Sequence, residues 1–304
     1  MEPAIEVRDL TKHYGATIGV EGLDLKVAGG DVFGFLGPNG AGKTTTIRML
    51  LDLIRPTRGA ARLFGGPASD HRLRQRVGYL PGELVLDERM SGRENLEFFD
   101  ALRASGLARP VPGERRDEMC ERLSLDADAL ERSVREYSRG MKQKLGLIAA
   151  LQHDPDLLIL DEPTTGLDPL VREALFDIMI ETGKAGKTVF HSSHVLSEVD
   201  RTCTRVGIIR DGCLLAVREI DTMRRASVRR MVVRFTDAVP LAELDLPGIE
   251  LLEHDGNQVV LRIAGPLDPL LATLARHRVS HLVFPEPNLE EAFVEFYRDG
   301  EVHE

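Results

Sequence analysis

Short apolar runs, each followed by a segment with helical spacing, organise much of this chain. Residues 32–36 and 157–160 are almost entirely apolar, which is typical of parallel strands buried on both faces. Residues 43–54 and 169–182 have the periodicity of helices, so we expect a helix after each of these strands. Residues 5–10 alternate between apolar and polar side chains, as a half-exposed strand does. This order of elements predicts an α/β domain built on a parallel sheet.

A helical section interrupts the strands, and a smaller module follows them. A capping-box pattern at residues 91–94 precedes an amphipathic run, and we expect a helical subdomain over about residues 84–152. The pattern changes after residue 222, so residues 1–222 form the first predicted domain and residues 223–304 a small α+β domain. The predicted strands are 5–10, 23–27, 32–36, 77–80, 157–160, 188–190, 206–209, 214–217, 230–235, 259–263 and 279–284, and the predicted helices are 43–54, 91–102, 114–123, 139–151, 169–182, 195–201, 267–276 and 289–297.

Composition and charge exclude several classes of protein. Of the 304 residues, 42% are hydrophobic and 29% are charged, a balance that excludes a chain disordered throughout. No apolar run approaches the roughly 18–20 residues that span a bilayer, and the N-terminus lacks a signal-peptide core, so we expect a chain that is soluble by itself. Three scattered cysteines favour a reducing cytosol over a disulfide scaffold. The net charge of −10 argues against a nucleic-acid partner.

A glycine-rich segment between a predicted strand and a predicted helix carries the strongest chemical signal. It reads Gly-Pro-Asn-Gly-Ala-Gly-Lys-Thr and fits the phosphate-binding pattern G-x-x-x-x-G-K-[ST]. The glycines let backbone N–H groups turn toward phosphate oxygens, and the helix N-terminus adds positive partial charge. Lys43 is expected to reach the β- and γ-phosphates, and Thr44 to ligate Mg²⁺. The expected nucleotide-binding residues of this segment are Gly37, Pro38, Asn39, Gly40, Ala41, Gly42, Lys43, Thr44 and Thr45.

Two acidic residues follow the apolar run at 157–160. Asp161 stands at the end of the buried strand, where a carboxylate can hold Mg²⁺ through water. Glu162 comes next and is the candidate general base that polarises an attacking water. An ordinary acidic strand end is the alternative interpretation. Together with the phosphate loop, the pair indicates hydrolysis of a nucleoside triphosphate.

Residues 137–144, which read Tyr-Ser-Arg-Gly-Met-Lys-Gln-Lys, resemble the signature of the ATP-binding-cassette (ABC) ATPases, usually Leu-Ser-Gly-Gly-Gln. Ser138 and Gly140 match, whereas arginine and methionine replace the first glycine and the glutamine. In the family this element closes on the γ-phosphate held by a second subunit. The resemblance covers about residues 4–220 and implies a P-loop fold with a RecA-like core, an antiparallel β subdomain and a helical subdomain. It also implies a head-to-tail dimer that sandwiches two ATP molecules.

Further residues match family motifs in the family's order. Asp168, in Gly-Leu-Asp, resembles the D-loop that crosses the dimer interface. His194, in Ser-Ser-His, resembles the switch histidine that contacts the γ-phosphate, and we interpret nearby His191 as a residue of the strand. Tyr14 resembles the aromatic residue that stacks on adenine. The catalytic set implied in this way is Lys43, Glu162 and His194.

One position departs from the family pattern. The family commonly places a glutamine after the strand at residues 77–80, where it senses Mg²⁺ and the transmembrane partner. Gly82 occupies that place and has no side chain. Glu83 is the candidate substitute from the next position, so the expected metal-binding set is Thr44, Asp161 and Glu83.

The loop Gly-Tyr-Leu-Pro, the signature and Ser-Ser-His-Val-Leu-Ser-Glu look most like ATPase subunits of bacterial type-2 ABC exporters, which include drug and antibiotic exporters. Residues 287–293 are also similar to the C-terminal ends of those subunits, although an amphipathic helix explains them equally well. The resemblance implies a MgATP-hydrolysing subunit, peripheral on the cytoplasmic face of the bacterial inner membrane. It would act as a homodimer or with a homologue, and drive a separate membrane permease through the segment 82–99. The alternatives are a soluble ABC ATPase of translation or DNA repair, and a P-loop kinase or GTPase.

Overall fold

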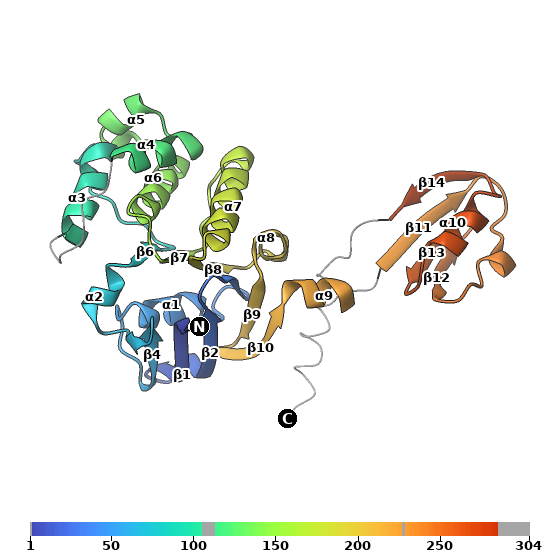
Figure 1. The fold of residues 1–304 in the computed structure, drawn as a ribbon, viewed down its shortest axis with the longest axis horizontal. Helices are drawn as coiled ribbons and strands as arrows, with labels where there is room; N and C mark the ends of the chain where they lie inside the picture. Colours follow the sequence, from blue (N-terminus) through green and yellow to red (C-terminus); the bar gives the residue numbers. More distant parts are fainter. Residues whose placement is uncertain (1, 105–112, 227–228, 285–304) are drawn as a thin grey trace. The chain divides into compact units, whose positions relative to one another are not determined.

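A computed structural model describes residues 2–104, 113–226 and 229–284 of the chain. It divides into two compact units, Met1–Glu219 and Ile220–Glu304. Their elements are labelled in Figure 1, and each unit is described by itself.

The first unit is built on a six-stranded sheet with the order β10-β9-β3-β8-β7-β6. Its strands are β3 (Val32–Leu36), β6 (Val77–Leu80), β7 (Leu157–Asp161), β8 (Thr188–Ser193), β9 (Arg205–Arg210) and β10 (Cys213–Glu219). Neighbouring strands from β9 to β6 are parallel, and β10 joins β9 as an antiparallel hairpin. Every residue of β3 and β7 is buried, which accounts for the uninterrupted apolar runs in their sequences.

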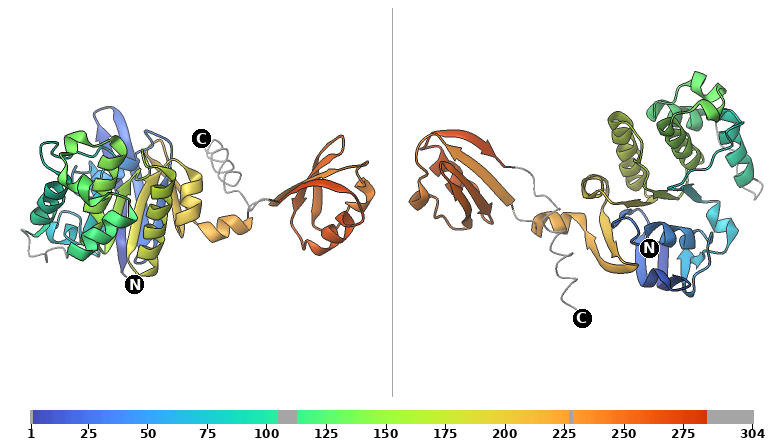
Figure 2. Two further views of the ribbon diagram at one scale, coloured as in Figure 1. Left: turned by 90° about the horizontal axis from the view of Figure 1, so that it is seen from above. Right: turned by 180° about the vertical axis from the view of Figure 1, so that it is seen from behind.

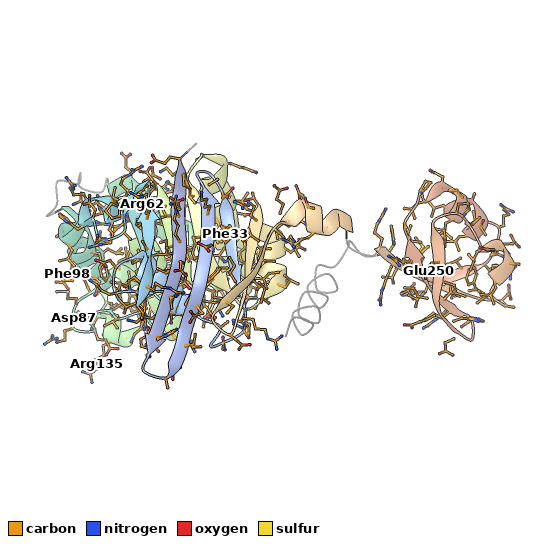
Figure 3. The ribbon with its side chains drawn as sticks, turned by 90° about the horizontal axis from the view of Figure 1, so that it is seen from below. Phe33, Arg62, Asp87, Phe98, Arg135 and Glu250 are labelled. Atoms are coloured by element: carbon orange, nitrogen blue, oxygen red, sulfur yellow. The ribbon has the colours of Figure 1, made fainter. Side chains whose placement is uncertain are left out.

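A four-stranded antiparallel sheet faces one side of the parallel sheet. Its order is β2-β1-β4-β5, formed by β1 (Pro3–Tyr14), β2 (Thr17–Ala28), β4 (Arg58–Leu63) and β5 (Gly66–Pro67). Helix α1 (Lys43–Leu50) lies between the two sheets and contributes to their common core. Within that core the rings of Phe33 and Phe190 stack with centroids 5.7 Å apart. Figure 3 shows Phe33 among the side chains of this interior and the exposed Arg62 and Phe98 toward the outside.

Helices lie on the opposite side of the parallel sheet. They are α3 (Gly92–Ala104), α4 (Gly113–Arg122), α5 (Ala127–Glu131), the 3-10 helix η1 (Val134–Glu136), α6 (Arg139–Leu151), α7 (Pro169–Lys184) and α8 (Leu196–Thr202). The short helix α2 (His71–Arg74) instead lies on the side of α1 and β4. Figures 1 and 2 show α6 and α7 rising on the side away from β1, β2 and β4, with α3, α4 and α5 grouped around α6. Helix α7 begins after Asp168 because this residue caps it. The Asp168 side chain accepts a hydrogen bond from the Val171 N–H, and a proline follows at the first helical position.

The second unit contains a small antiparallel sheet with the order β12-β13-β11-β14. Its elements are α9 (Ile220–Ala226), β11 (Arg229–Phe235), the 3-10 helix η2 (Leu241–Glu243), β12 (Ile249–Asp255), β13 (Gln258–Ile263), α10 (Asp268–Leu274) and β14 (Val279–Val283). The inward-facing residues Met231, Val233 and Phe235 alternate along β11 and form a core with Leu270 and Leu274 of α10. This core is separate from that of the first unit.

The structure corrects the sequence analysis in several places, and the short elements β5, α2 and α9 were not predicted. The helix predicted over 43–54 ends at Leu50, because Asp52 adopts the left-handed φ of 55° that breaks the helical path. Strand β4 was not predicted, since Arg-Gly-Ala-Ala-Arg-Leu has no apolar alternation and its pairing with β1 is a tertiary contact. Strand β12 was also missed. The helix predicted over 289–297 and the motif at 287–293 lie outside the described residues. Among the described residues, no helix has both the length and the apolarity needed to cross a membrane.

Candidate nucleotide-binding site

The glycine-rich segment joins the end of β3 to the start of α1. Gly40 and Gly42 have φ values of 83° and 103°, which only glycine adopts without strain. A Cβ on Gly37 would lie 2.3 Å from the backbone oxygen of Ile209, so no larger residue fits there. The buried Lys43 ammonium donates to the carbonyl oxygens of Gly37 at 2.7 Å and Pro38 at 3.0 Å. The lysine is thus folded back over the loop, where its ammonium lies beside the N–H groups expected to bind phosphate.

Asp161 forms the centre of a hydrogen-bonded chain at the carboxyl end of β7. The Thr44 hydroxyl donates to Asp161 Oδ2 at 2.7 Å, and the Ser192 hydroxyl donates to Oδ1 at 2.6 Å. Ser192 also accepts a hydrogen bond from the Glu162 N–H at 2.9 Å. Ser192 therefore orients both acidic residues. The sequence analysis assigned no role to Ser192, because its only signal was its place two residues before His194 in the Ser-Ser-His motif.

Glu162 lies between two cationic or potentially cationic groups. Its Oε1 is 3.3 Å from Lys43 Nζ, and its Oε2 is 3.1 Å from His194 Nδ1. The residue has a φ of 49°, a conformation that a non-glycine side chain rarely adopts and that is typical of functional positions. The side chain of Glu162 is 26% exposed and that of His194 48% exposed. The structure thus brings three residues of the expected catalytic set into one cluster, open to a ligand.

A cavity of about 320 Å³ joins Tyr14 to this cluster. Tyr14 is 48% exposed, a high value for an aromatic residue, and the ammonium of Lys12 lies 5.3 Å from its ring centroid. The lining residues are Tyr14, Thr17, Ile18, Gly19, Asn39, Gly40, Gly42, Lys43, Thr44, Thr45 and Glu162. A flat aromatic surface at one end and phosphate-binding groups at the other match the two halves of a nucleotide.

Ser138, Gly140 and Asp168 are not among the residues that line this cavity in the described part of the chain. Ser138 caps α6 by accepting from the Met141 N–H at 3.2 Å, and Asp168 caps α7. The hydrogen bond from the Val171 N–H is the main cause that lowers the pKa of Asp168, which is also 3.4 Å from Lys144 Nζ. A Cβ on Gly140 would lie 2.8 Å from the oxygen of Gly166, so the signature and the Asp168 loop adjoin each other.

The segment after β6 lies against Asp161 at Gly82. A Cβ on Gly82 would lie 3.2 Å from Asp161 Oδ2, so a side chain at this position would point at the acidic residue. Glu83 is exposed, and no hydrogen bond or ion pair of its carboxylate is found among the described residues. The described residues hold no group of three or more His, Cys, Asp and Glu side chains arranged for a metal. The role expected for Glu83 stays a prediction.

The oxygen atoms at Thr44 and Asp161 nevertheless fit a magnesium ion. Mg²⁺ usually takes one or two protein oxygens and completes its octahedron with water and substrate phosphates. Two such oxygens meet at 2.7 Å in this structure, beside the phosphate loop. A cluster of three acidic or imidazole ligands is not required by that chemistry.

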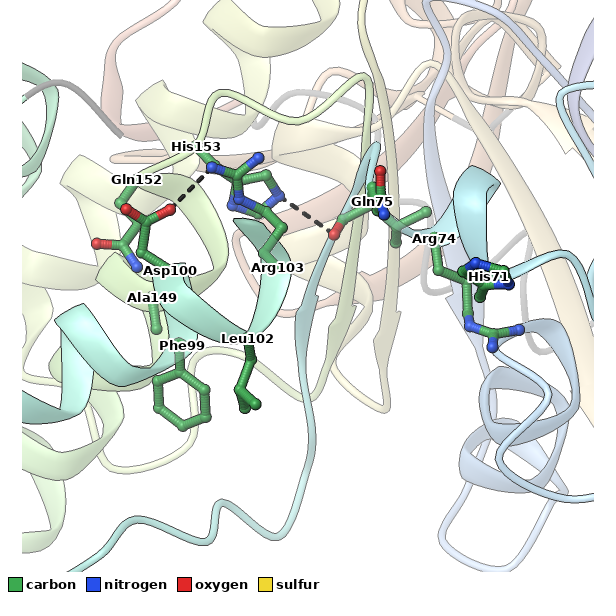
Figure 4. Close-up of a pocket in the computed structure, with 11 residues that line it drawn as sticks. His71, Arg74, Gln75, Phe99, Asp100, Leu102, Arg103, Ala149, Gln152 and His153 are labelled. Carbon is green, nitrogen blue, oxygen red and sulfur yellow. Dashed lines mark hydrogen bonds and ion pairs between the residues drawn. The ribbon is translucent and has the colours of Figure 1, made fainter. Parts of the chain in front are cut away.

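His191 and a second cavity lie outside the nucleotide cavity. Burial lowers the pKa of His191 to about 4, and its Nε2 lies 3.0 Å from Cys203 Sγ in the interior. The second cavity, about 490 Å³, is bounded by α2, β6, α3 and α6 (Figure 4). His153 in its wall contacts the Val77 carbonyl at 3.2 Å, and burial lowers its pKa to about 4. The lining residues are His71, Arg74, Gln75, Val77, Phe99, Asp100, Leu102, Arg103, Ala149, Gln152 and His153.

Fold and site together define a P-loop ATPase of the ABC type. The family model described as ABC transporter matches residues 20–165. The chain is 38% identical to the Nod factor export ATP-binding protein I of Cupriavidus metallidurans, over 97% of both chains. It is 37% identical to the daunorubicin/doxorubicin resistance ATP-binding protein DrrA of Streptomyces peucetius, over 96% of this chain and 91% of that protein.

A solved ATP-binding subunit of an ABC transporter superposes with a TM-score of 0.65 and 30% identity, covering 73% of this chain and 92% of that one. The chain therefore belongs to the ATP-binding subunits of ABC transporters, in the branch of the exporter ATPases. It is an ATPase that couples ATP hydrolysis to transport, rather than a kinase, a GTPase or a non-transport ABC protein. The predicted fold class is confirmed.

Proposed function

We propose that this subunit powers the export of a drug-like or antibiotic-like compound through a separate membrane permease. The observation that carries the proposal is the cluster in which Glu162 lies between Lys43 and His194. Such a cluster suits ATP hydrolysis, and the relatives that match almost the whole chain are named for drug resistance and Nod factor export. Selection of the cargo would lie in the permease.

Hydrolysis at this site depends mainly on positioning and on stabilisation of charge. Lys43 and the loop amides hold the β- and γ-phosphates, and Tyr14 stacks on adenine. Thr44 and Asp161 would hold Mg²⁺, with Glu83 as a further candidate, and the ion when bound would neutralise phosphate charge. Glu162 accepts a proton from the attacking water, and His194 contacts the γ-phosphate.

The subunit works as a head-to-tail dimer, either with itself or with a homologue. Ser138, Gly140 and Asp168 adjoin one another but do not line the cavity of their own chain. This arrangement supports the proposal that they close on the nucleotide held by a second subunit. The helix that begins beside Ser138 then presents its N-terminal N–H groups to the γ-phosphate.

The permease contacts the ATPase at the second cavity. Phe99 and Leu102 supply apolar surface there, and Arg103 in the same wall is paired with Asp100 at 2.8 Å (Figure 4). Helix α3, which lines this cavity, directly follows the segment that begins beside Asp161 at Gly82. A change in the nucleotide site therefore has a short covalent route to the permease. Through this contact the subunit is peripheral on the cytoplasmic face of the bacterial inner membrane.

Affinity purification from solubilised native membranes tests this function. A stoichiometric polytopic partner that stimulates ATP hydrolysis is expected in the eluate, and Lys43→Ala should abolish the stimulated activity without releasing the partner. Leu102→Glu, at an exposed position in the wall of the second cavity, should weaken recovery of the partner, with Leu53→Glu, equally exposed outside that wall, as the matched control. Active ATPase recovered without any membrane partner would contradict the transport role.

A further inference from the structure

Ser193, which directly precedes His194, is held by three hydrogen bonds outside the nucleotide cavity. Its carbonyl oxygen accepts from the Gly37 N–H at 3.2 Å. Its hydroxyl accepts from the Val195 N–H at 3.0 Å and lies 2.8 Å from Glu198 Oε2. Ser193 is only 3% exposed, so these protein groups are its main partners. It links the first glycine of the phosphate loop to the segment that carries His194.

Glu198 is a buried acidic residue to which the mechanism above assigns no role. It lies in the first turn of α8 and is 7% exposed. A buried carboxylate is costly unless it accepts hydrogen bonds, and the Ser193 hydroxyl supplies one. That hydroxyl has a single proton, and Glu198 at 2.8 Å is closer than the Val195 carbonyl at 3.4 Å. When the hydroxyl donates its proton in a hydrogen bond to Glu198, a lone pair on its oxygen remains to accept from the Val195 N–H.

A second set of contacts ties the far end of α8 to the same strand. His191 Nε2 lies 3.0 Å from Cys203 Sγ and 3.3 Å from Thr202 Oγ1. The Thr202 hydroxyl also donates to the backbone oxygen of Glu198 at 2.8 Å. Helix α8 is therefore fixed to β8 on both sides of the turn, which leaves the exposed His194 on a rigid support.

We propose that Glu198 is a positioning residue for hydrolysis, which acts through the Ser193 hydroxyl to hold His194 at the γ-phosphate site. This inference rests on the role proposed for His194. Glu198 does not line the nucleotide cavity, so its loss should act on the transition state rather than on ATP binding. The expected signature is a lower kcat with the KM for ATP almost unchanged.

A double-mutant cycle in the full chain, with its membrane partner if hydrolysis requires one, tests the inference. Glu198→Ala is expected to lower kcat about tenfold and to change KM less than about twofold. Glu198→Gln keeps an acceptor oxygen for the Ser193 hydroxyl and should retain most of the activity. Ser197→Ala, at an exposed position of the same helix, is the control and should leave kcat unchanged. In a His194→Ala background, Glu198→Ala should have less than about a twofold further effect.

Two results would overturn the proposal. One is an unchanged kcat in Glu198→Ala. The other is that Glu198→Ala lowers kcat by the same factor in the His194→Ala background as in the wild-type chain. The second result would place the action of Glu198 elsewhere. If Glu198→Ala does not fold, Glu198→Met removes the carboxylate at similar volume and takes its place in the cycle with the same expectations. His194→Ala with wild-type kcat would instead refute the role of His194, which distinguishes failure of the proposed function from failure of this inference.

Discussion

The carboxylate of Glu162 lies 3.3 Å from the ammonium of Lys43, although one residue follows β7 and the other begins α1. The lysine thus pairs with the candidate base while it donates hydrogen bonds to two carbonyls of the phosphate loop. A γ-phosphate placed against Lys43 would compete with Glu162 for this cation, and the freed carboxylate would turn to the attacking water. Substrate binding and activation of the base are coupled through one ion pair.

Lys43→Ala should reduce ATP hydrolysis at least about 100-fold, because it removes the charge that offsets the phosphates during phosphoryl transfer. Steady-state ATPase assays at saturating ATP measure this loss. Lys187→Ala removes a lysine that pairs with Asp154 instead, and serves as a charge-matched control with wild-type activity. Equal losses in the two variants would show that the effect is not specific to the nucleotide site.

Tyr14→Ala should raise the KM for ATP about tenfold with little change in kcat, since stacking on adenine stabilises substrate and transition state equally. Tyr14→Phe keeps the aromatic face and should behave as wild type. Replacement of ATP by an inorganic polyphosphate, which has no base, should remove the difference between Tyr14→Ala and the parent. A kcat effect without a KM effect would contradict stacking.

Ser138→Arg should abolish hydrolysis while each monomer keeps its affinity for ATP, because Ser138 lies outside the cavity of its own chain. Binding of a fluorescent ATP analogue under monomeric conditions measures the affinity, and hydrolysis is followed against protein concentration. The control is Ala127→Arg, which places the same side chain at an exposed position of α5. A parallel loss of binding in the monomer would place Ser138 in its own chain's site.

His153 should make the protein less stable as the pH falls. Burial, assisted by the charge of Arg103, lowers its pKa from 6.5 to about 4. Between these values the unfolded chain binds a proton that the folded chain does not, so stability decreases as pH falls from 6.5 toward 4, by roughly 3 kcal/mol in all. His153→Gln, whose amide can donate to the Val77 carbonyl, should flatten the fall in Tm between pH 7 and pH 5. His281→Gln, an exposed substitution, should leave that fall unchanged.

Sequence patterns predict best the elements whose buried side chains show as an apolar run or as helical spacing within the element itself. β3, β6 and α6 begin and end at the predicted residues. β4 was missed because four of its six residues are exposed and its place depends on pairing Val7 with Ala61. Local patterns cannot reveal a strand that is specified mainly by its neighbour.

The site, like the fold, has a part that local sequence patterns predict and a part that depends on tertiary contacts. Motif spacing pointed to Lys43, Thr44, Asp161 and Glu162, and the structure places these side chains in contact. The hydrogen bonds of Ser192 to Asp161 and of Ser193 to Glu198 could not be predicted, because a serine within a strand gives no signal of the side chain that it will meet. Tertiary structure alone shows which serines orient acidic residues.

The most direct measurement of the central claim is single-turnover hydrolysis by Glu162→Gln with radiolabelled ATP, combined with size-exclusion chromatography of the same sample. The account predicts that the variant binds ATP with nearly wild-type affinity, cleaves it at least about 100-fold more slowly, and elutes as a dimer that retains intact ATP. Hydrolysis of the bound ATP at the wild-type rate would contradict the assignment of Glu162 as the base and, with it, the mechanism built on its contacts with Lys43 and His194.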